Sequence, residues 1–321
     1  MTESENFVDV VVLSWNRAES TVATLQNILE QRNVRLIIWI VDQGSDPNEL
    51  DKVKNFIKDK TQIHLLENGK NIGVAAGRNL GIRQGNAEFI VCIDNDAVFA
   101  SHFAIAIALF RFAQSDNIAA IGFKINLFNT NQLDHTSWAY PKSQKKFKDT
   151  EFLTTRFCGA GHALRRSCLE KTDYYDEILF FYWEELDLSY QLINMGYKII
   201  YYPTVVVQHK IDPEKKVTWS GKRFYYLVRN AVYLNWKYHR SITALIPVAL
   251  GYLVKGIRNG LMKSAWQGVV DACDMLSNSE DLIKYKMSKA GQQYIHDNDT
   301  KYRGSLIKRF FSEALGKLPK G

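Results

Sequence analysis

The segment IVCIDNDAVF, residues 90–99, runs from apolar residues directly into two acidic side chains, Asp94 and Asp96. Neighbouring carboxylates repel each other, and burying a charge without a partner is costly. A divalent cation would compensate both, because hard cations prefer carboxylate oxygens as ligands. The alternative is a structural turn, since Asp and Asn favour turns. A metal ion is therefore the first candidate for this segment.

The first hundred residues alternate between short apolar runs and segments with helical spacing, such as 18–31. The apolar runs are VDVVVLS (8–14), RLIIWIVD (35–42), QIHLLE (62–67) and EFIVCID (88–94). Nearly continuous apolar strands that alternate with helices indicate a parallel sheet covered on both faces. With right-handed crossovers, they predict a three-layer α/β/α domain.

Polar side chains follow several of these predicted strands at the point where each strand ends. In open α/β sheets, ligands bind beyond the carboxyl ends of the strands. We therefore expect a binding site built from Ser14, Asn16 and Arg17 after the first strand, Asp42 after the second, and Asp94, Asn95 and Asp96 after the fourth.

The alternation of apolar and helical segments ends at about residue 124. Residues 124–156 are polar and show no clear period, which predicts a long surface excursion close to the site. Order returns with a predicted helix, EELDLSYQLINMG (184–196), which a glycine ends. A further predicted strand, YKIIYYPTVVVQH (197–209), closes this part of the chain.

Several nucleotide-binding and catalytic motifs are absent. No GxxxxGK[ST] phosphate loop occurs, and NIGVAAGRNLG (71–81) lacks the GxGxxG spacing of a dinucleotide fold. A phosphatase interpretation of the two aspartates would require a Thr-containing signature, which the segment lacks.

Six segments occur along the chain in the order VVVLSWNR, IWIVDQGS, NIGVAAGRNLGI, IDNDAVF, CGAGHALRR and YDEILFFYWEELDLSYQLINMGYKIIYYPTVVVQH. Over roughly residues 8–209, this order resembles family 2 glycosyltransferases with the GT-A fold. The resemblance implies a metal-dependent enzyme that inverts the sugar's configuration while moving it from a nucleotide-diphosphate donor, with UDP or dTDP favoured. The acceptor would be a hydroxyl of a glycan or glycolipid, in bacterial cell-surface polysaccharide synthesis.

This resemblance also assigns roles on the donor side. Asp96 is similar to the family's direct ligand of Mn²⁺ or Mg²⁺, while Asp94 would face the donor's ribose or a metal-bound water. His209 matches a family histidine that coordinates the metal or a phosphate. Asp42 would contact the nucleotide base, although it also suits the N-cap of the next helix. Arg78 resembles an arginine near the base or diphosphate, with an ordinary surface position as its alternative.

WEELDL, residues 183–188, supplies the predicted general base. In the family pattern the second acid deprotonates the acceptor, which corresponds to Glu185. The family usually has Asp at this position, and the longer side chain of Glu185 leaves Glu184 open as an alternative base. The family commonly has Arg where this chain has Gln191, so a possible counter-charge is missing. Trp183 suits a platform for a sugar ring and a core position equally well.

Charge divides the chain into an acidic front and a basic tail. Residues 1–208 carry 21 Lys and Arg against 25 Asp and Glu, whereas residues 209–321 carry 20 against 9. We expect a GT-A domain over 1–215 and a mostly helical, basic region over 216–321. Nucleic acid and an anionic membrane surface are the candidate partners of such a tail, and we expect the membrane rather than nucleic acid.

The tail contains an uncharged apolar run, ITALIPVALGYLV (242–254). A core helix, a helix lying in a membrane interface and a membrane span all remain open, although the run is shorter than the roughly 20 residues of a span. The polar N-terminus and four isolated cysteines favour a cytoplasmic protein. The basic tail adds the expectation that the protein attaches peripherally to the inner face of the cell membrane.

Two other function classes compete with a glycosyltransferase. A sugar nucleotidyltransferase would show a Gly-rich basic loop after the first strand, but LSWNRAES (13–20) has no glycine. A catalytically silent nucleotide-sugar or glycan-binding homologue would not need Asp96, Glu185 and His209 intact.

Overall fold

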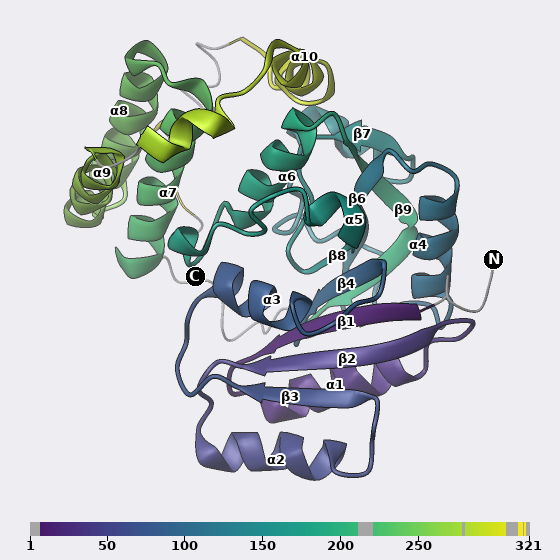
Figure 1. Cartoon of the computed structure of the whole chain (residues 1–321). Helices are drawn as coiled ribbons and strands as arrows, with labels where there is room; N and C mark the ends of the chain where they lie inside the picture. Colours follow the sequence, from purple (N-terminus) through teal and green to yellow (C-terminus); the bar gives the residue numbers. More distant parts are fainter. Residues whose placement is uncertain (1–6, 211–220, 278–279, 306–313, 317, 319–321) are drawn as a thin grey trace.

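The computed structural model describes residues 7–210, 221–277, 280–305, 314–316 and 318 (Figure 1). One mixed sheet lies between helices on both of its faces, and a group of further helices packs at one side. The predicted α/β architecture and the helical C-terminal region are both confirmed. The expected domain boundary at residue 215 lies outside the described residues.

The N-terminal part of the sheet is parallel. Strand β1 lies at its centre and pairs in parallel with β2 on one side and β4 on the other, while β3 pairs with β2. The four strands agree with the four apolar runs of the sequence. The elements are β1 Phe7–Ser14, α1 Ala18–Leu29, β2 Arg35–Asp42, α2 Pro47–Ile57, β3 Ile63–Glu67, α3 Val74–Ile82 and β4 Phe89–Asp94.

Beyond β4 the sheet becomes mixed, in a part of the chain for which the sequence predicted no strand direction. Strand β8 pairs antiparallel with both β4 and β6, and β9 then runs parallel to β6. The apolar content of a strand reports its burial on both faces but not its direction, so this reversal was hidden. The elements are β5 Ala97–Phe99, α4 Ala104–Ala113, β6 Ile118–Leu127, β7 Phe152–Thr154, β8 Gly161–Arg165, α5 Arg166–Leu169, α6 Glu184–Asn194 and β9 Lys198–His209.

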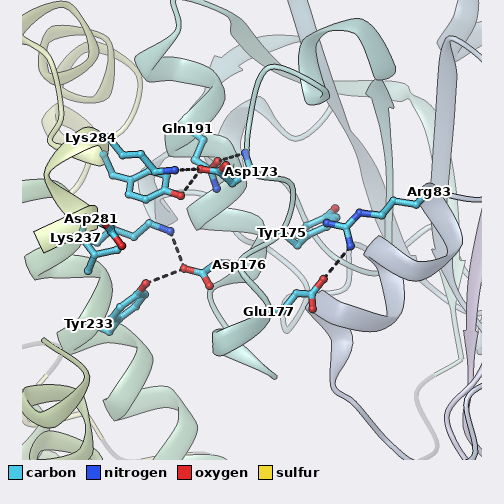
Figure 2. A pocket seen from close by; sticks show the side chains of 12 residues that line it. Arg83, Asp173, Tyr175, Asp176, Glu177, Gln191, Tyr233, Lys237, Asp281 and Lys284 are labelled. Carbon is cyan, nitrogen blue, oxygen red and sulfur yellow. Dashed lines mark hydrogen bonds and ion pairs between the residues drawn. The ribbon is translucent and has the colours of Figure 1, made fainter. Parts of the chain in front are cut away.

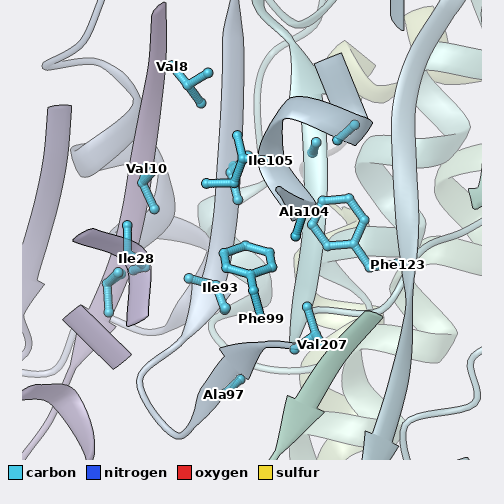
Figure 3. Packing of buried hydrophobic residues seen from close by; sticks show 14 of the residues in the cluster. Val8, Val10, Ile28, Ile93, Ala97, Phe99, Ala104, Ile105, Phe123 and Val207 are labelled. Atoms are coloured by element: carbon cyan, nitrogen blue, oxygen red, sulfur yellow. The ribbon is translucent and has the colours of Figure 1, made fainter. Parts of the chain in front are cut away.

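Alternate residues of β1 build the core on the two faces of the sheet. Val10 packs with Ile28 of α1 and Ile105 of α4 in one cluster, part of which is shown in Figure 3. Val11 points to the other face, into a cluster with Ile82 of α3 and residues of α5 and α6. This double coverage explains why β1 reads as an almost unbroken apolar run.

The polar excursion is partly buried, contrary to the surface loop that its composition predicted. Tyr140 is 5% exposed, and its ring lies 4.9 Å from that of Tyr201 on β9. Trp138 and Phe152 join the same aromatic cluster. Lys142–Phe147 form a short 3-10 helix, η2. Widely spaced aromatic residues give no periodic signal, so the sequence did not reveal this packing.

Helix α7, Gly221–His239, lies between the sheet domain and the next two helices of the chain (Figure 1). Phe224, Val228 and Val232 face α8 (Ile242–Arg258) and α9 (Met262–Ser277). Tyr233, Leu234 and Tyr238 pack on the other side, against the segment that precedes α6. The chain continues through η5 (Glu280–Tyr285), α10 (Lys289–Asn298) and η6 (Thr300–Tyr302), and the turn η3 (Glu177–Leu179) precedes α6.

Helix α8 contains the uncharged run whose placement the sequence left open. Leu245, Val248, Ala249, Tyr252 and Leu253 pack toward α7, whereas the opposite side of the helix is exposed. Among the helices that the structure describes, none combines the length and apolar character needed to cross a bilayer.

Candidate active site

The carboxyl ends of β1, β2 and β4 meet at one edge of the sheet, as predicted. Ser14 pairs in register with Asp42, and Leu13 pairs with Asp94. A short hairpin-like turn carries the chain from Asp94 through Asp96 into β5, whose first residue pairs with His209 at the end of β9. The turn and the end of β9 thus bring the three predicted metal ligands together.

Asp94, Asp96 and His209 form a cluster that fits a cation. One ligand atom from each lies within 4.8 Å of the other two, and all three side chains are partly exposed. Two carboxylates and an imidazole suit a divalent metal, with the carboxylates favouring Mg²⁺ or Mn²⁺. The structure therefore supports a metal site where the sequence predicted one.

The cluster is held together by charged neighbours. Arg17 Nη1 lies 2.8 Å from Asp96 Oδ2, and His209 Nε2 lies 3.4 Å from Asp96 Oδ1. Burial lowers the pKa of His209, but hydrogen bonds with Asp134 and Asp96 outweigh it and raise that pKa to about 10. The two cationic partners compensate the carboxylate that the sequence left unpaired.

Asp134 is a site residue that the sequence did not reveal. Its side chain is 1% exposed and its Oδ2 lies 3.2 Å from His209 Nδ1. Burial raises the pKa of Asp134, but hydrogen bonds from His209, Ser137 and Thr136 hold it below its usual range. A carboxylate behind a metal-binding imidazole orients the ring. The bridge between Leu133 and Asn126 of β6 and the hydrogen bond from the Asp134 backbone to the Ile125 carbonyl place Asp134 there, and no motif marks it.

Arg78 is buried, which excludes the ordinary surface position. Its Nη1 donates to Glu185 Oε1 at 2.6 Å, and its Nη2 donates to the Gly159 carbonyl at 3.0 Å. Asp94 Oδ1 lies 3.6 Å from Nη2. A Cβ on Gly159 would approach Glu185 Oε1 to 2.3 Å, so this close arrangement requires glycine. Arg78 therefore connects the metal cluster with the predicted base.

The two glutamates at the start of α6 differ sharply in environment. Glu185 is partly exposed and paired with Arg78. Glu184 is 3% exposed, and its Oε2 has no hydrogen-bond partner in the part of the chain that the structure describes. Burial and the charge of Glu185 raise the pKa of Glu184 well above its usual value. A carboxyl that retains its proton cannot accept another, which favours Glu185 as the base.

Two polar residues of the predicted donor side shape the loop after β2. Asp42 Oδ2 accepts hydrogen bonds from the backbone of Gly44 and Ser45, each at 3.0 Å. Helix α2 begins at Pro47 after Asp46, so the alternative in which Asp42 caps that helix is wrong. Asn16 Oδ1 accepts from the Asp46 backbone at 2.8 Å.

Three predicted residues turn their polar atoms away from the metal cluster. Ser14 Oγ contacts Thr21 Oγ1 at 3.2 Å, and Asn95 Nδ2 donates to the same Thr21 oxygen at 2.9 Å. Trp183 Nε1 donates to the Leu227 carbonyl of α7 at 3.0 Å. The structure thus packs Trp183, which is half-buried, partly against α7, and its use as a platform for a sugar ring stays a prediction.

A strained loop precedes α6. Phe180, Tyr182 and Trp183 have φ of 56°, 70° and 75°, a region that residues with side chains seldom occupy. Asn230 of α7 is fully buried, and its amide donates to the carbonyls of residues 179, 181 and 182 at 2.7, 2.9 and 2.9 Å. One amide from the C-terminal region therefore secures the turn that positions the glutamates.

A second contact of α7 lies in a cavity of about 340 Å³ between α6 and the C-terminal helices (Figure 2). Lys237, 1% exposed, lies 2.7 Å from Asp176 Oδ2 and 2.7 Å from Asp187 Oδ1. Gln191 Nε2 donates to the other oxygen of Asp187 at 2.8 Å. Lys237 thus supplies the counter-charge that Gln191 cannot.

Comparisons of the sequence with known proteins give the following matches. The model of glycosyl transferase family 2 matches residues 9–172, about half of the chain. The dTDP-rhamnosyl transferase RfbF of Shigella flexneri is 24% identical over 243 residues, which cover 71% of this chain and 80% of that protein.

Two solved structures share the fold. The mannosyltransferase PcManGT of Pyrobaculum calidifontis, in complex with GDP-Man and Mn²⁺, superposes with a TM-score of 0.58 at 20% identity, over 97% of this chain and 88% of that one. GalNAc-T7 with UDP, GalNAc and Mn²⁺ gives a TM-score of 0.61 at 16% identity, over 98% and 59%. At these identities the likeness shows the fold alone.

Proposed function

The chain belongs to glycosyl transferase family 2, and we propose that it is a metal-dependent enzyme that inverts configuration at the transferred sugar. The observation that carries this proposal is the arrangement of Asp94, Arg78 and Glu185, in which one buried guanidinium links the candidate cation site to the carboxylate of Glu185. In that arrangement the cation site would serve the departing diphosphate, and the carboxylate of Glu185 would serve the incoming hydroxyl.

Asp94, Asp96 and His209 would hold Mn²⁺ or Mg²⁺. The bound cation would neutralise charge on the donor's diphosphate as the glycosidic bond breaks. Arg17 lies against Asp96 and is placed to contact the same phosphates. Both solved relatives named above contain Mn²⁺, which supports the choice of metal.

Glu185 would take the proton of the acceptor hydroxyl. It stands in the first turn of α6, where the helix dipole favours the ionised form of a carboxylate. Arg78 stabilises that form and orients it toward the cluster. Inversion follows from a single in-line displacement, because the acceptor oxygen enters opposite the departing diphosphate and no enzyme nucleophile is needed.

The donor would be a UDP- or dTDP-sugar, with Asp42 and Asn16 shaping the pocket for the nucleoside. The name of the rhamnosyl transferase relative supports dTDP. The acceptor would be a hydroxyl of a glycan or glycolipid in bacterial cell-surface polysaccharide synthesis, at the inner face of the membrane. The GT-A domain would span 1–215, and residues 216–321 would serve acceptor and membrane contacts.

Hydrolysis of a panel of nucleotide sugars tests this proposal. The purified chain is incubated with each donor in Mn²⁺, in Mg²⁺ or in chelator, and the released nucleotide and the anomer of the sugar are identified. We expect metal-dependent release of a nucleoside diphosphate and a sugar of inverted configuration. Retained configuration would overturn the mechanism. Formation of nucleotide sugar from a nucleoside triphosphate and a sugar phosphate would indicate a nucleotidyltransferase, and inertness toward every donor a silent homologue.

A further inference from the structure

Helices α8 and α9 expose a set of apolar side chains on the side of α7 that is remote from the sheet (Figure 1). Ile242, Ile246 and Leu250 are each more than half exposed and recur every four residues, so they share one face of α8. Met262, Trp266 and Val270 repeat this spacing on α9. We call these six residues together with Ile257 the apolar face.

On α8, the apolar face is the outer side of a helix whose inner side is apolar as well. No charged residue occurs from 242 to 254, and the inner side of α8 already packs on α7. Contiguous apolar patches on a protein surface mark sites of association with a protein, ligand or membrane.

Charge decides between those partners. Residues 242–263, which form α8 and the turn into α9, carry Lys255, Arg258 and Lys263 and no Asp or Glu, whereas Asp271 and Asp274 lie further along α9. Arg258 and Lys263 are exposed around the turn that joins α8 to α9, next to the apolar face. A second copy of the chain would bring the same positive charge to the contact and be repelled. An anionic lipid surface offers the opposite charge together with an apolar interior.

We propose that the apolar face lies in the interface of an anionic bilayer, with Arg258 and Lys263 at the lipid headgroups and no helix crossing. The proposal rests on the function given above and narrows its acceptor to one carried by a lipid. The same helix α7 that supports α8 and α9 holds the loop before Glu185 through Asn230. Docking of this face therefore fixes the base relative to the bilayer, where a lipid-borne hydroxyl is presented.

Flotation with vesicles tests the docking directly. The full chain is mixed with vesicles of phosphatidylcholine alone or of phosphatidylcholine with phosphatidylglycerol, at low and high salt. We expect flotation only with phosphatidylglycerol present and a loss of binding as salt rises. The triple variant Ile246→Glu/Leu250→Glu/Trp266→Glu should not float with either kind of vesicle. Arg258→Gln and Lys263→Gln should each weaken binding by about fivefold.

Phe110→Glu and Ile283→Glu are matched controls, because both residues are exposed apolar side chains outside the apolar face. They should float as the unmodified chain does. Equal binding to neutral vesicles, or undiminished flotation of the triple variant, would overturn the proposal, as would a dimer that this variant dissociates. Donor hydrolysis by the unmodified chain is measured in parallel without vesicles. If the unmodified chain hydrolyses no donor, the proposed function is refuted, and the result on membrane docking still stands.

Discussion

The metal side and the base side of the active site are built in different ways. Asp94 and Asp96 come from one turn, and their partners Arg17 and His209 also stand at strand ends. Glu185 instead lies in the first turn of α6, and the loop that precedes this helix is strained. A different part of the chain, helix α7, holds the loop through Asn230 and the helix through Lys237. The first side follows from local pattern, whereas the second depends on tertiary contacts.

This difference indicates that the C-terminal region helps to position the proposed base. Lys237 reaches Asp187, two residues after Glu185, and Asn230 holds carbonyls of residues 179–182 just before it. Changes on the metal side should therefore affect donor binding, and changes on the α7 side should affect turnover and stability. The predictions below test that separation.

Asp96→Ala should have the largest effect. It removes a metal ligand and leaves Arg17 and His209 without their shared carboxylate, so metal-linked binding of the nucleoside diphosphate should be abolished. Calorimetry with UDP or dTDP, with and without Mn²⁺, measures the loss. The exposed Asp59→Ala serves as the control and should bind normally. Unchanged metal-linked affinity in Asp96→Ala would remove the assignment.

Glu185→Gln should lower turnover by about 10²–10⁴-fold while donor affinity stays nearly constant, because a positioned base acts mainly in the transition state. The variant keeps side-chain size but cannot take a proton. Glu184→Gln should be milder, since the buried Glu184 keeps its proton. Steady-state kinetics on both variants decides, and a silent Glu184→Gln beside an active Glu185→Gln would exchange their roles.

Lys237→Met should destabilise the fold by about 3–5 kcal/mol, because Asp176 and Asp187 would then lose a buried counter-charge. Urea unfolding of the variant measures the change. Asp187→Asn in the same background should recover part of it, and Gln191→Arg should do so by returning a positive charge to the neighbouring position on α6. A stability equal to that of the unmodified chain would show that this ion-pair network contributes little.

The sequence predicted the strands, their polar ends and the aspartates of the metal cluster because each is encoded by neighbouring residues, whereas the role of His209 followed from the resemblance to a known family. The four apolar runs became β1 to β4, and Asp94, Asp96 and His209 meet as expected. Asp134 was hidden, since a lone acid in a polar segment has no signature. The support from Asn230 was equally invisible, because an Asn within an amphipathic helix reveals nothing of the loop it contacts 50 residues away.

Asn230→Ala should produce the smallest change and the most informative one. It removes the three hydrogen bonds that the Asn230 amide donates to the loop. The Leu179 carbonyl still accepts from Arg229 Nη2 at 3.2 Å, whereas the carbonyls of residues 181 and 182 lose this donor, at a cost of about 1–3 kcal/mol for a carbonyl that stays unsatisfied once the loop has relaxed. The loop with positive φ at Tyr182 and Trp183 would then relax, and Glu185 would lose its fixed position. We expect kcat to fall while the donor KM stays constant, because the metal cluster does not touch this loop. Asn235→Ala, on the same helix, is the matched control, since its side-chain oxygen has no hydrogen-bond partner among the described residues. A parallel rise in donor KM would show that the two sides of the site are not separable, and an unchanged kcat would show that α7 stabilises the loop without positioning the base.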